Sequence, residues 1–82
     1  MAQSTDSRQR ALGEAVRRIR KERGLTQEAL YHASRVHRNH ISALERGALN
    51  PSYQTMLRIA DALEISLSRL VAMSEELEKL RP

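Results

Sequence analysis

The chain has 82 residues, no cysteine, phenylalanine or tryptophan, and a formal net charge of +4. This length allows one small domain with an aliphatic core, and the missing thiols exclude disulfides and thiolate metal sites. No apolar run approaches the roughly 18 residues of a membrane span. Seven basic and three acidic residues lie among positions 1–24, which indicates either a basic end that meets a polyanion or an ordinary solvated basic helix.

The first predicted element is an amphipathic helix that follows a short polar start. Residues 1–6 are expected to be a disordered tail. In the stretch SRQRALGEAVRRIRKERG, Leu12, Val16 and Ile19 recur at helical spacing, with basic residues on the outside. Gly24 is typical of the left-handed residue that ends a helix. We therefore expect a basic helix that ends just before Gly24.

Two short helices separated by a tight turn come next. Thr26 suits the N-cap of the first, TQEALYHAS, and His37 would cap the second, RNHISALERG, which Gly47 ends. In the second helix, Ile41 and Leu44 are the only large apolar side chains, and they share one face. Two short helices of this kind, the second with one thin apolar edge, follow the helix-turn-helix plan.

The opposite face of the second short helix carries hydrogen-bonding groups. At roughly 100° per residue, Asn39, Ser42 and Arg46 lie on this face together with Ala43, and Arg38 lies on its flank. Arginine can bind guanine O6 and N7 through two hydrogen bonds, and asparagine can do the same at adenine N6 and N7. We interpret this face as one that enters the major groove of DNA, although an ordinary solvated helix surface carries the same residue types.

Two further helices are expected at the C-terminal end. Ser52 caps YQTMLRIADAL, in which Ile59 and Leu63 face inward, and Ser66 caps LSRLVAMSEELEKL. Every element found along the chain is a helix, and no strand pattern is present. The predicted fold class is therefore all-α, with one helix-turn-helix domain over residues 7–73.

The last helix carries a candidate dimer interface. Leucine and methionine recur there at spacings of three, four and three, which is the a/d pattern of a helix–helix seam: Leu70, Met73, Leu77 and Leu80. We expect residues 74–82 to extend the helix beyond the domain and to pair with a second copy. The alternative is that Leu70 and Met73 pack on their own domain while Leu77 and Leu80 lie in solvent.

The order of these motifs resembles the Cro-type phage-repressor family of DNA-binding domains, also called the XRE family. The stretches RRIRKERGLTQEAL, VHRNHISALERG and NPSYQTMLRIADALEISLSRL carry the resemblance. It spans roughly residues 9–72 and includes the glycine stops, the TQ helix start, the LERG end of the reading helix and the NPS link. The resemblance implies a five-helix bundle whose second and third helices read DNA, usually as a dimer on a two-fold operator.

The resemblance also implies roles for individual residues. The positions that read bases are occupied by Arg38, Asn39, Ser42 and Ala43. The positions for contact with the DNA backbone are occupied by Thr26, Gln27, His40, Arg46 and Asn50. In the family a largely buried ion pair ties the first helix to the third, and the matching residues here are Arg20 and Glu45.

Three residues depart from the family pattern around the turn. The family often has a small residue where this chain has Tyr31, and glycine where it has Arg35. A residue other than glycine at that position is expected to need a positive φ, a strain of roughly 1 kcal/mol. His37 stands in place of a better N-cap such as serine.

Other functions fit the sequence less well. His32, His37 and His40 could suggest a metal site, but Arg35 and Arg38 lie beside them and would repel a cation. No nucleophile–base pair nominates an enzyme, so we expect no catalysis, no cofactor and no small-molecule ligand. The rival is a protein-interaction module that uses the same scaffold without DNA. The outward face lacks the large apolar anchors that such a module favours.

We therefore expect a small cytoplasmic transcription regulator that binds double-stranded DNA as a homodimer and does not associate with membranes. Repression is favoured because the chain carries no obvious effector domain. Three subclasses fit equally: a free-standing repressor, a controller of a restriction–modification system, and the antitoxin of a toxin pair. A gel shift with random DNA across a salt series would separate these DNA-binding classes from the protein-interaction module.

Overall fold

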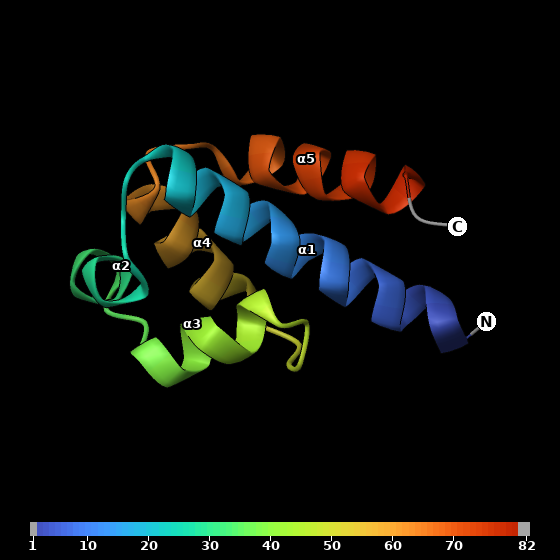
Figure 1. Cartoon of the computed structure of the whole chain (residues 1–82), viewed down its shortest axis with the longest axis horizontal. Coiled ribbons are helices and arrows are strands. Elements are labelled where there is room, and N and C mark those ends of the chain that lie inside the picture. The colour runs from blue at the N-terminus through green and yellow to red at the C-terminus, as the bar shows by residue number, and fades with distance from the viewer. Residues whose placement is uncertain (1, 81–82) are drawn as a thin grey trace.

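The structure, a computed structural model, describes the backbone of residues 2–80 and the side chains of residues 7–80 (Figure 1). Over that range the chain forms five helices: α1 (Ala2–Glu22), α2 (Gln27–Ser34), α3 (Arg38–Glu45), α4 (Tyr53–Ala62) and α5 (Leu67–Lys79). No described residue lies in a strand. The predicted all-α, five-helix architecture is therefore confirmed.

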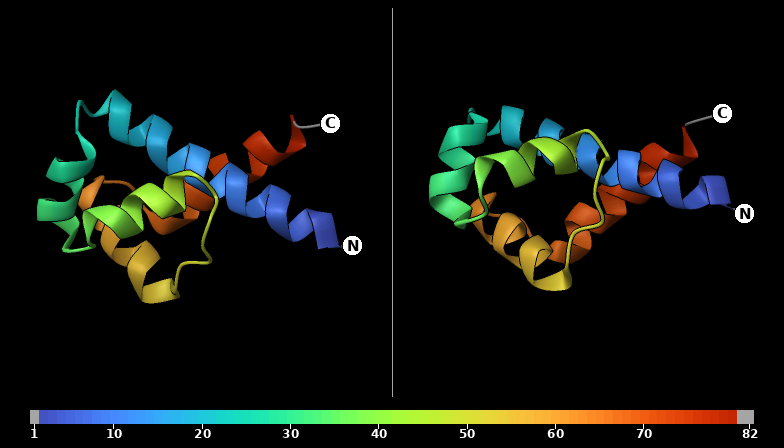
Figure 2. Two further views of the ribbon diagram at one scale, coloured as in Figure 1. Left: turned by 60° about the horizontal axis from the view of Figure 1, so that its bottom comes forward. Right: turned by 90° about the horizontal axis from the view of Figure 1, so that it is seen from below.

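The longest helix, α1, organises the bundle. It packs against α5, which runs back along it in the opposite direction, and against α3, which crosses below it in the view of Figure 1. Helix α2 contacts α3 and α4, and α4 contacts α5. Figure 2 shows α2 at the end of the molecule opposite to both ends of the described chain. The helix-turn-helix unit is thus held between α1 and α4.

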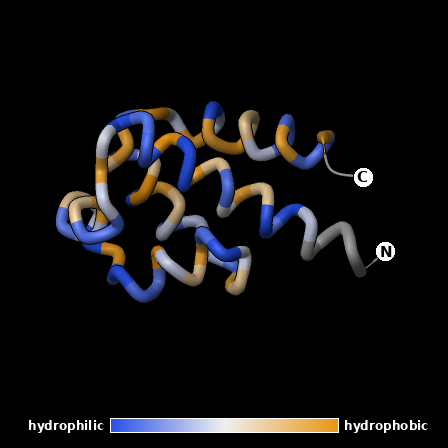
Figure 3. Tube along the Cα trace, viewed as in Figure 1, coloured by the Kyte–Doolittle hydropathy of each residue, from blue (hydrophilic) through white to orange (hydrophobic). Residues whose placement is uncertain are grey.

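An aliphatic core fills the space between the helices. In Figure 3 hydrophobic and hydrophilic residues alternate along the helices, as expected for helices with one buried face. All five helices or their caps contribute large side chains that are fully buried: Val16, Leu30, Ile41, Leu44, Ile59, Leu63 and Leu70. The inward positions predicted for α3 and α4 are among them, while in α1 Val16 and Ile19 are buried and Leu12 is half-buried.

Local signals set where the helices begin and end. Each of the four predicted N-caps accepts a hydrogen bond from a backbone N–H two or three residues further on: Thr26, His37, Ser52 and Ser66. Gly24 and Gly47 both have φ 72° and follow α1 and α3 in the left-handed conformation. These boundaries agree with the sequence prediction because capping depends on adjacent residues alone.

The first helix begins earlier than the sequence prediction placed it. Residues 2–6 were expected to be a disordered tail, but their backbone continues α1, while residue 1 lies outside the described residues. The stretch contains no glycine or proline that would break a helix. Adding turns to a helix that already exists costs little, because the unfavourable nucleation step has been completed elsewhere.

The predicted dimer seam on α5 needs a correction. Leu70 and Leu77 are 0% and 6% exposed within this single chain, so both belong to its own core. Met73 is half-buried and Leu80 is 80% exposed. The alternative, with Leu77 in solvent, is also wrong. The reason is the length of α1, whose early turns reach the end of α5, as the contact between Arg8 and Glu78 at 3.4 Å shows.

Candidate nucleic-acid interface

The turn between α2 and α3 adopts the conformation that a glycine would favour. Arg35 has φ 65° and ψ 17°, and its backbone N–H donates to the carbonyl oxygen of Tyr31 at 2.8 Å. The predicted positive φ is confirmed, and it costs about 1 kcal/mol. The Tyr31 ring stacks on His32 with centroids 5.0 Å apart and lies 5.3 Å from the His37 ring. The larger side chain at position 31 is thus accommodated by packing against two histidines.

Helix α3 is seated by its apolar edge and presents its polar face outward. Ile41 and Leu44 are 0% and 1% exposed and fix the helix in the core. The four residues predicted to read bases all lie on the other side, the first two exposed and the last two half-buried: Arg38, Asn39, Ser42 and Ala43. The fold therefore brings the predicted base-reading residues together on one face, over two successive turns of α3.

A carboxylate of α2 lies beside the first turn of α3. Glu28 Oε1 is 3.5 Å from Arg38 Nη1, and Glu28 Oε2 is 3.3 Å from His32 Nε2. These side chains are more than half exposed, and ion pairs of this kind contribute about 0–1 kcal/mol. The Arg38 guanidinium can therefore leave Glu28 at little cost when a stronger acceptor is offered.

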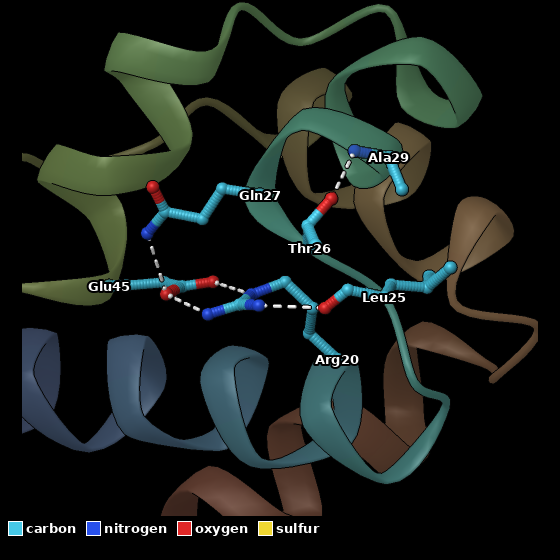
Figure 4. A network of polar contacts seen from close by, with 6 residues as sticks. All are labelled: Arg20, Leu25, Thr26, Gln27, Ala29 and Glu45. Atoms are coloured by element: carbon cyan, nitrogen blue, oxygen red, sulfur yellow. Dashed lines mark hydrogen bonds and ion pairs between the residues drawn. The ribbon is translucent and has the colours of Figure 1, made fainter.

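A buried ion pair joins α1 to the end of α3, as the sequence resemblance implied (Figure 4). Arg20 Nε donates to Glu45 Oε2 at 2.6 Å, and Arg20 Nη2 donates to Glu45 Oε1 at 3.0 Å. Arg20 Nη1 also donates to the carbonyl oxygen of Leu25 at 2.7 Å. The two charged side chains are only 9% and 5% exposed. The pair therefore ties three segments together: α1, the loop that follows it, and α3.

Gln27, the first residue of α2, joins the same network. Its amide Nε2 donates to Glu45 Oε1 at 3.0 Å (Figure 4). The family resemblance implied a DNA-backbone contact for Gln27, and its amide nitrogen retains a second N–H that can donate. Thr26 caps α2 by accepting from the Ala29 N–H at 3.0 Å, so its hydroxyl hydrogen can still be donated. Both residues stand at the positive end of the α2 dipole.

The remaining residues predicted to contact the DNA backbone do not form one group. Arg46 is exposed, and its Nη1 donates to Ser42 Oγ at 2.7 Å, next to Gln27 in a shared hollow. His40 is exposed on α3 itself. Asn50 is exposed in the loop after α3 and lines a different hollow with Arg8. The structure thus groups Gln27 and Arg46 and separates them from Asn50.

Sequence reasoning missed Gly13, which positions α3. A Cβ atom at this buried residue would lie 2.2 Å from the backbone oxygen of Leu44 and 2.8 Å from that of Glu45. Helix α1 can approach the end of α3 this closely only because position 13 has no side chain. The available signal was a glycine inside an otherwise helical pattern, which costs about 1 kcal/mol against alanine and suggests close packing.

The three histidines have different polar surroundings, although His32 and His37 both pack against the Tyr31 ring. His32 lies by Glu28, His37 Nδ1 accepts the Asn39 N–H at 3.1 Å, and His40 is exposed on α3. Within the described residues, no three His, Cys, Asp or Glu side chains gather as a metal ion would require. In that same part of the chain, no helix combines the length and apolar character needed to cross a membrane.

The chain is similar to known proteins over most of its length. Residues 16–70 match the family model described as Helix-turn-helix. The HTH-type transcriptional regulator y4dJ of Sinorhizobium fredii is 38% identical over 65 residues, which cover 79% of this chain and 84% of that protein. The immunity repressor protein of Bacillus phage phi105 is 38% identical over 60 residues, 73% of this chain and 42% of the repressor. The crystal structure of the clp gene regulator ClgR from Corynebacterium glutamicum superposes with a TM-score of 0.85 at 32% identity, over 89% of this chain and 78% of that one.

Proposed function

This chain belongs to the helix-turn-helix family of transcriptional regulators, and we propose that it is a repressor that binds a specific operator by inserting α3 into the major groove. The observation that carries the proposal is the outward face of α3. Arg38 and Asn39 are exposed there, while Ile41 and Leu44 hold the opposite edge in the core. Side chains that read bases must be presented by a rigid element. Helix α3 is held by its apolar edge in the core and by the ion pair between Arg20 and Glu45 at its end.

We further propose that the repressor binds as a homodimer. Met73 and Leu80 are the residues of the predicted seam that the core does not fully bury. Met73 and Leu80 are seven residues apart and therefore share one side of α5, which would offer apolar surface to a second copy. A two-fold dimer would set two copies of α3 about 34–36 Å apart, so the operator would be a pseudo-palindrome with half-site centres roughly 10 bp apart.

The experiment that tests this function is selection of bound sites from random duplexes, together with sedimentation of the free protein. We expect an enriched sequence that occurs twice in inverted orientation, and a dimer at micromolar concentration. An enriched single half-site with a monomeric protein would contradict the homodimer alone. If no sequence is enriched and binding is weak even at low salt, the proposal of a DNA-binding repressor is wrong.

Replacing base-reading side chains should alter sequence preference locally. We expect Arg38→Ala and Asn39→Ala each to weaken binding to the selected site by about 1–3 kcal/mol and to relax the preference at one base pair. Arg46→Ala is the control, because loss of a phosphate contact should weaken binding to all sequences alike. Titration of matched and mismatched duplexes measures both effects. An Arg38→Ala protein with the same selected site and affinity as the wild type would overturn the assignment of α3.

A further inference from the structure

Two adjoining hollows open between α1 and α3, with volumes of about 300 and 260 Å³. They share Arg17 of α1 and the side chains of Glu45 and Arg46 at the end of α3. The larger also reaches Lys21 and the Gln27 side chain at the start of α2. We refer to the two hollows together as the α1–α3 cleft.

The lining of the α1–α3 cleft carries a clear excess of positive charge. Its two carboxylates, Glu14 and Glu45, are each held by an arginine, at 2.7 Å from Arg18 and 2.6 Å from Arg20. Four other lining residues are cationic, exposed, and without an ion pair among the described residues: Arg10, Arg17, Lys21 and Arg46. The cleft therefore has basic groups that the fold leaves unneutralised.

The positions of these cations on α1 are unfavourable for the free protein. Arg17 and Lys21 are four residues apart and Arg10 lies seven before Arg17, so all three project from one side of the helix. Of these, Arg17 and Lys21 are neighbours on the helix surface, and a like-charged pair at this spacing destabilises a helix by about 0.2–0.5 kcal/mol. A polyanion bound in the cleft would relieve this repulsion.

The α1–α3 cleft adjoins the face of α3 that would read bases. Ser42, one of the predicted base-reading residues, lines the larger hollow and accepts a hydrogen bond from Arg46 at 2.7 Å. A helix lying in the major groove has the phosphate backbone of the duplex on its flanks. A duplex whose major groove holds α3 would thus bring phosphates to the mouth of the cleft.

We propose that the α1–α3 cleft extends the DNA contact of α3 onto α1, with Arg17 and Lys21 binding phosphates of the strand that borders the occupied major groove. The inference rests on the proposed function and extends it to α1, outside the helix-turn-helix unit. Guanidinium and ammonium groups form strong charge-assisted hydrogen bonds with phosphate oxygens, and they do so without regard to base sequence. The cleft therefore contributes affinity and salt dependence, while α3 supplies the sequence preference.

The test compares Arg17→Ala/Lys21→Ala with Arg58→Ala/Arg69→Ala, which removes the same charge from exposed positions of α4 and α5. Affinity for a random-sequence duplex is measured from about 50 to 200 mM salt. Each lost phosphate contact lowers the slope of log affinity against log salt by about 0.9, so the cleft variant should lose roughly 2 from its slope. The control variant should keep the wild-type slope, and both variants should select the wild-type site. Thermal melts check that each variant folds.

Equal slopes for the wild type and both variants would overturn the cleft as a phosphate site and leave the proposed repressor intact. A changed site selection by the cleft variant would also overturn it, because phosphate contacts carry no base information. Failure of the wild type to bind any duplex would overturn the proposed function and the cleft with it. The three results are distinguishable in one set of titrations.

Discussion

Replacing Arg20 with methionine should lower the free energy of unfolding by about 3–5 kcal/mol. The substitution leaves the Glu45 carboxylate, whose side chain is 5% exposed, without its partner. Gln27 alone would then hold that charge, through one hydrogen bond of 3.0 Å from its uncharged amide. Thermal and denaturant melts measure the loss, and an Arg20→Met melt that coincides with the wild type would show that the pair has no structural role.

A double variant separates the stranded charge from the loss of the ion pair itself. Arg20→Met/Glu45→Met removes both charges and fills the space with side chains of similar volume. Replacements of this kind are often neutral or stabilising, so the double variant should recover most of the stability lost in Arg20→Met. A double variant as unstable as the single one would instead point to a packing defect at position 20.

Placing a methyl group on Gly13 should be the second strongly damaging change, at about 3 kcal/mol, the upper end for overpacked sites. The added Cβ would lie 2.2 Å from the backbone oxygen of Leu44, and a backbone atom cannot rotate away as a flexible side chain can. The end of α3 must therefore shift, and Glu45 with it. We expect Gly13→Ala to lower both the melting temperature and the affinity for DNA.

Gly24→Ala is the matched control for this effect. Gly24 has φ 72° but nothing within 4 Å of the position that its Cβ would occupy. The control thus carries only the left-handed strain, about 1–2 kcal/mol, and leaves α3 where it is. At position 13 the backbone is helical, so alanine by itself would favour the helix by up to about 1 kcal/mol over glycine. Any loss of stability in Gly13→Ala therefore comes from the clash with α3. A Gly13→Ala protein at least as stable as Gly24→Ala would show that α1 and α3 do not meet so closely.

The features that could be predicted from the residues themselves are those that depend on neighbouring positions in the sequence. Caps such as Thr26 and Ser52, and the apolar edge formed by Ile41 and Leu44, were predicted from neighbouring residues and are present. The Arg20–Glu45 contact spans 25 positions and was implied by the family resemblance, since no spacing rule connects residues so far apart.

The features that sequence reasoning missed are contacts between distant helices. Leu77 was assigned to a dimer because its a/d spacing marks a seam without saying which helix fills the other side. The other side is filled from within the same chain, where α5 packs along α1. Gly13 was overlooked because its role depends on the carbonyl groups of Leu44 and Glu45. Both Gly13 and Leu77 lie outside residues 16–70, which match the family model.

At Gly13 the distance between α1 and the end of α3 is set by contact between backbone atoms, and not by side chains. Packed helices lie about 8–10 Å apart depending on the side chains between them, and a glycine contact brings them to the short end of that range. Because α1 has α5 on one side and the end of α3 on the other, the offset between these two helices cannot drift with side-chain rotamers. A dimer joined through α5 would therefore hold its two α3 helices at a fixed separation. It would discriminate against operators whose half-site centres are even one base pair closer together or further apart than this separation allows.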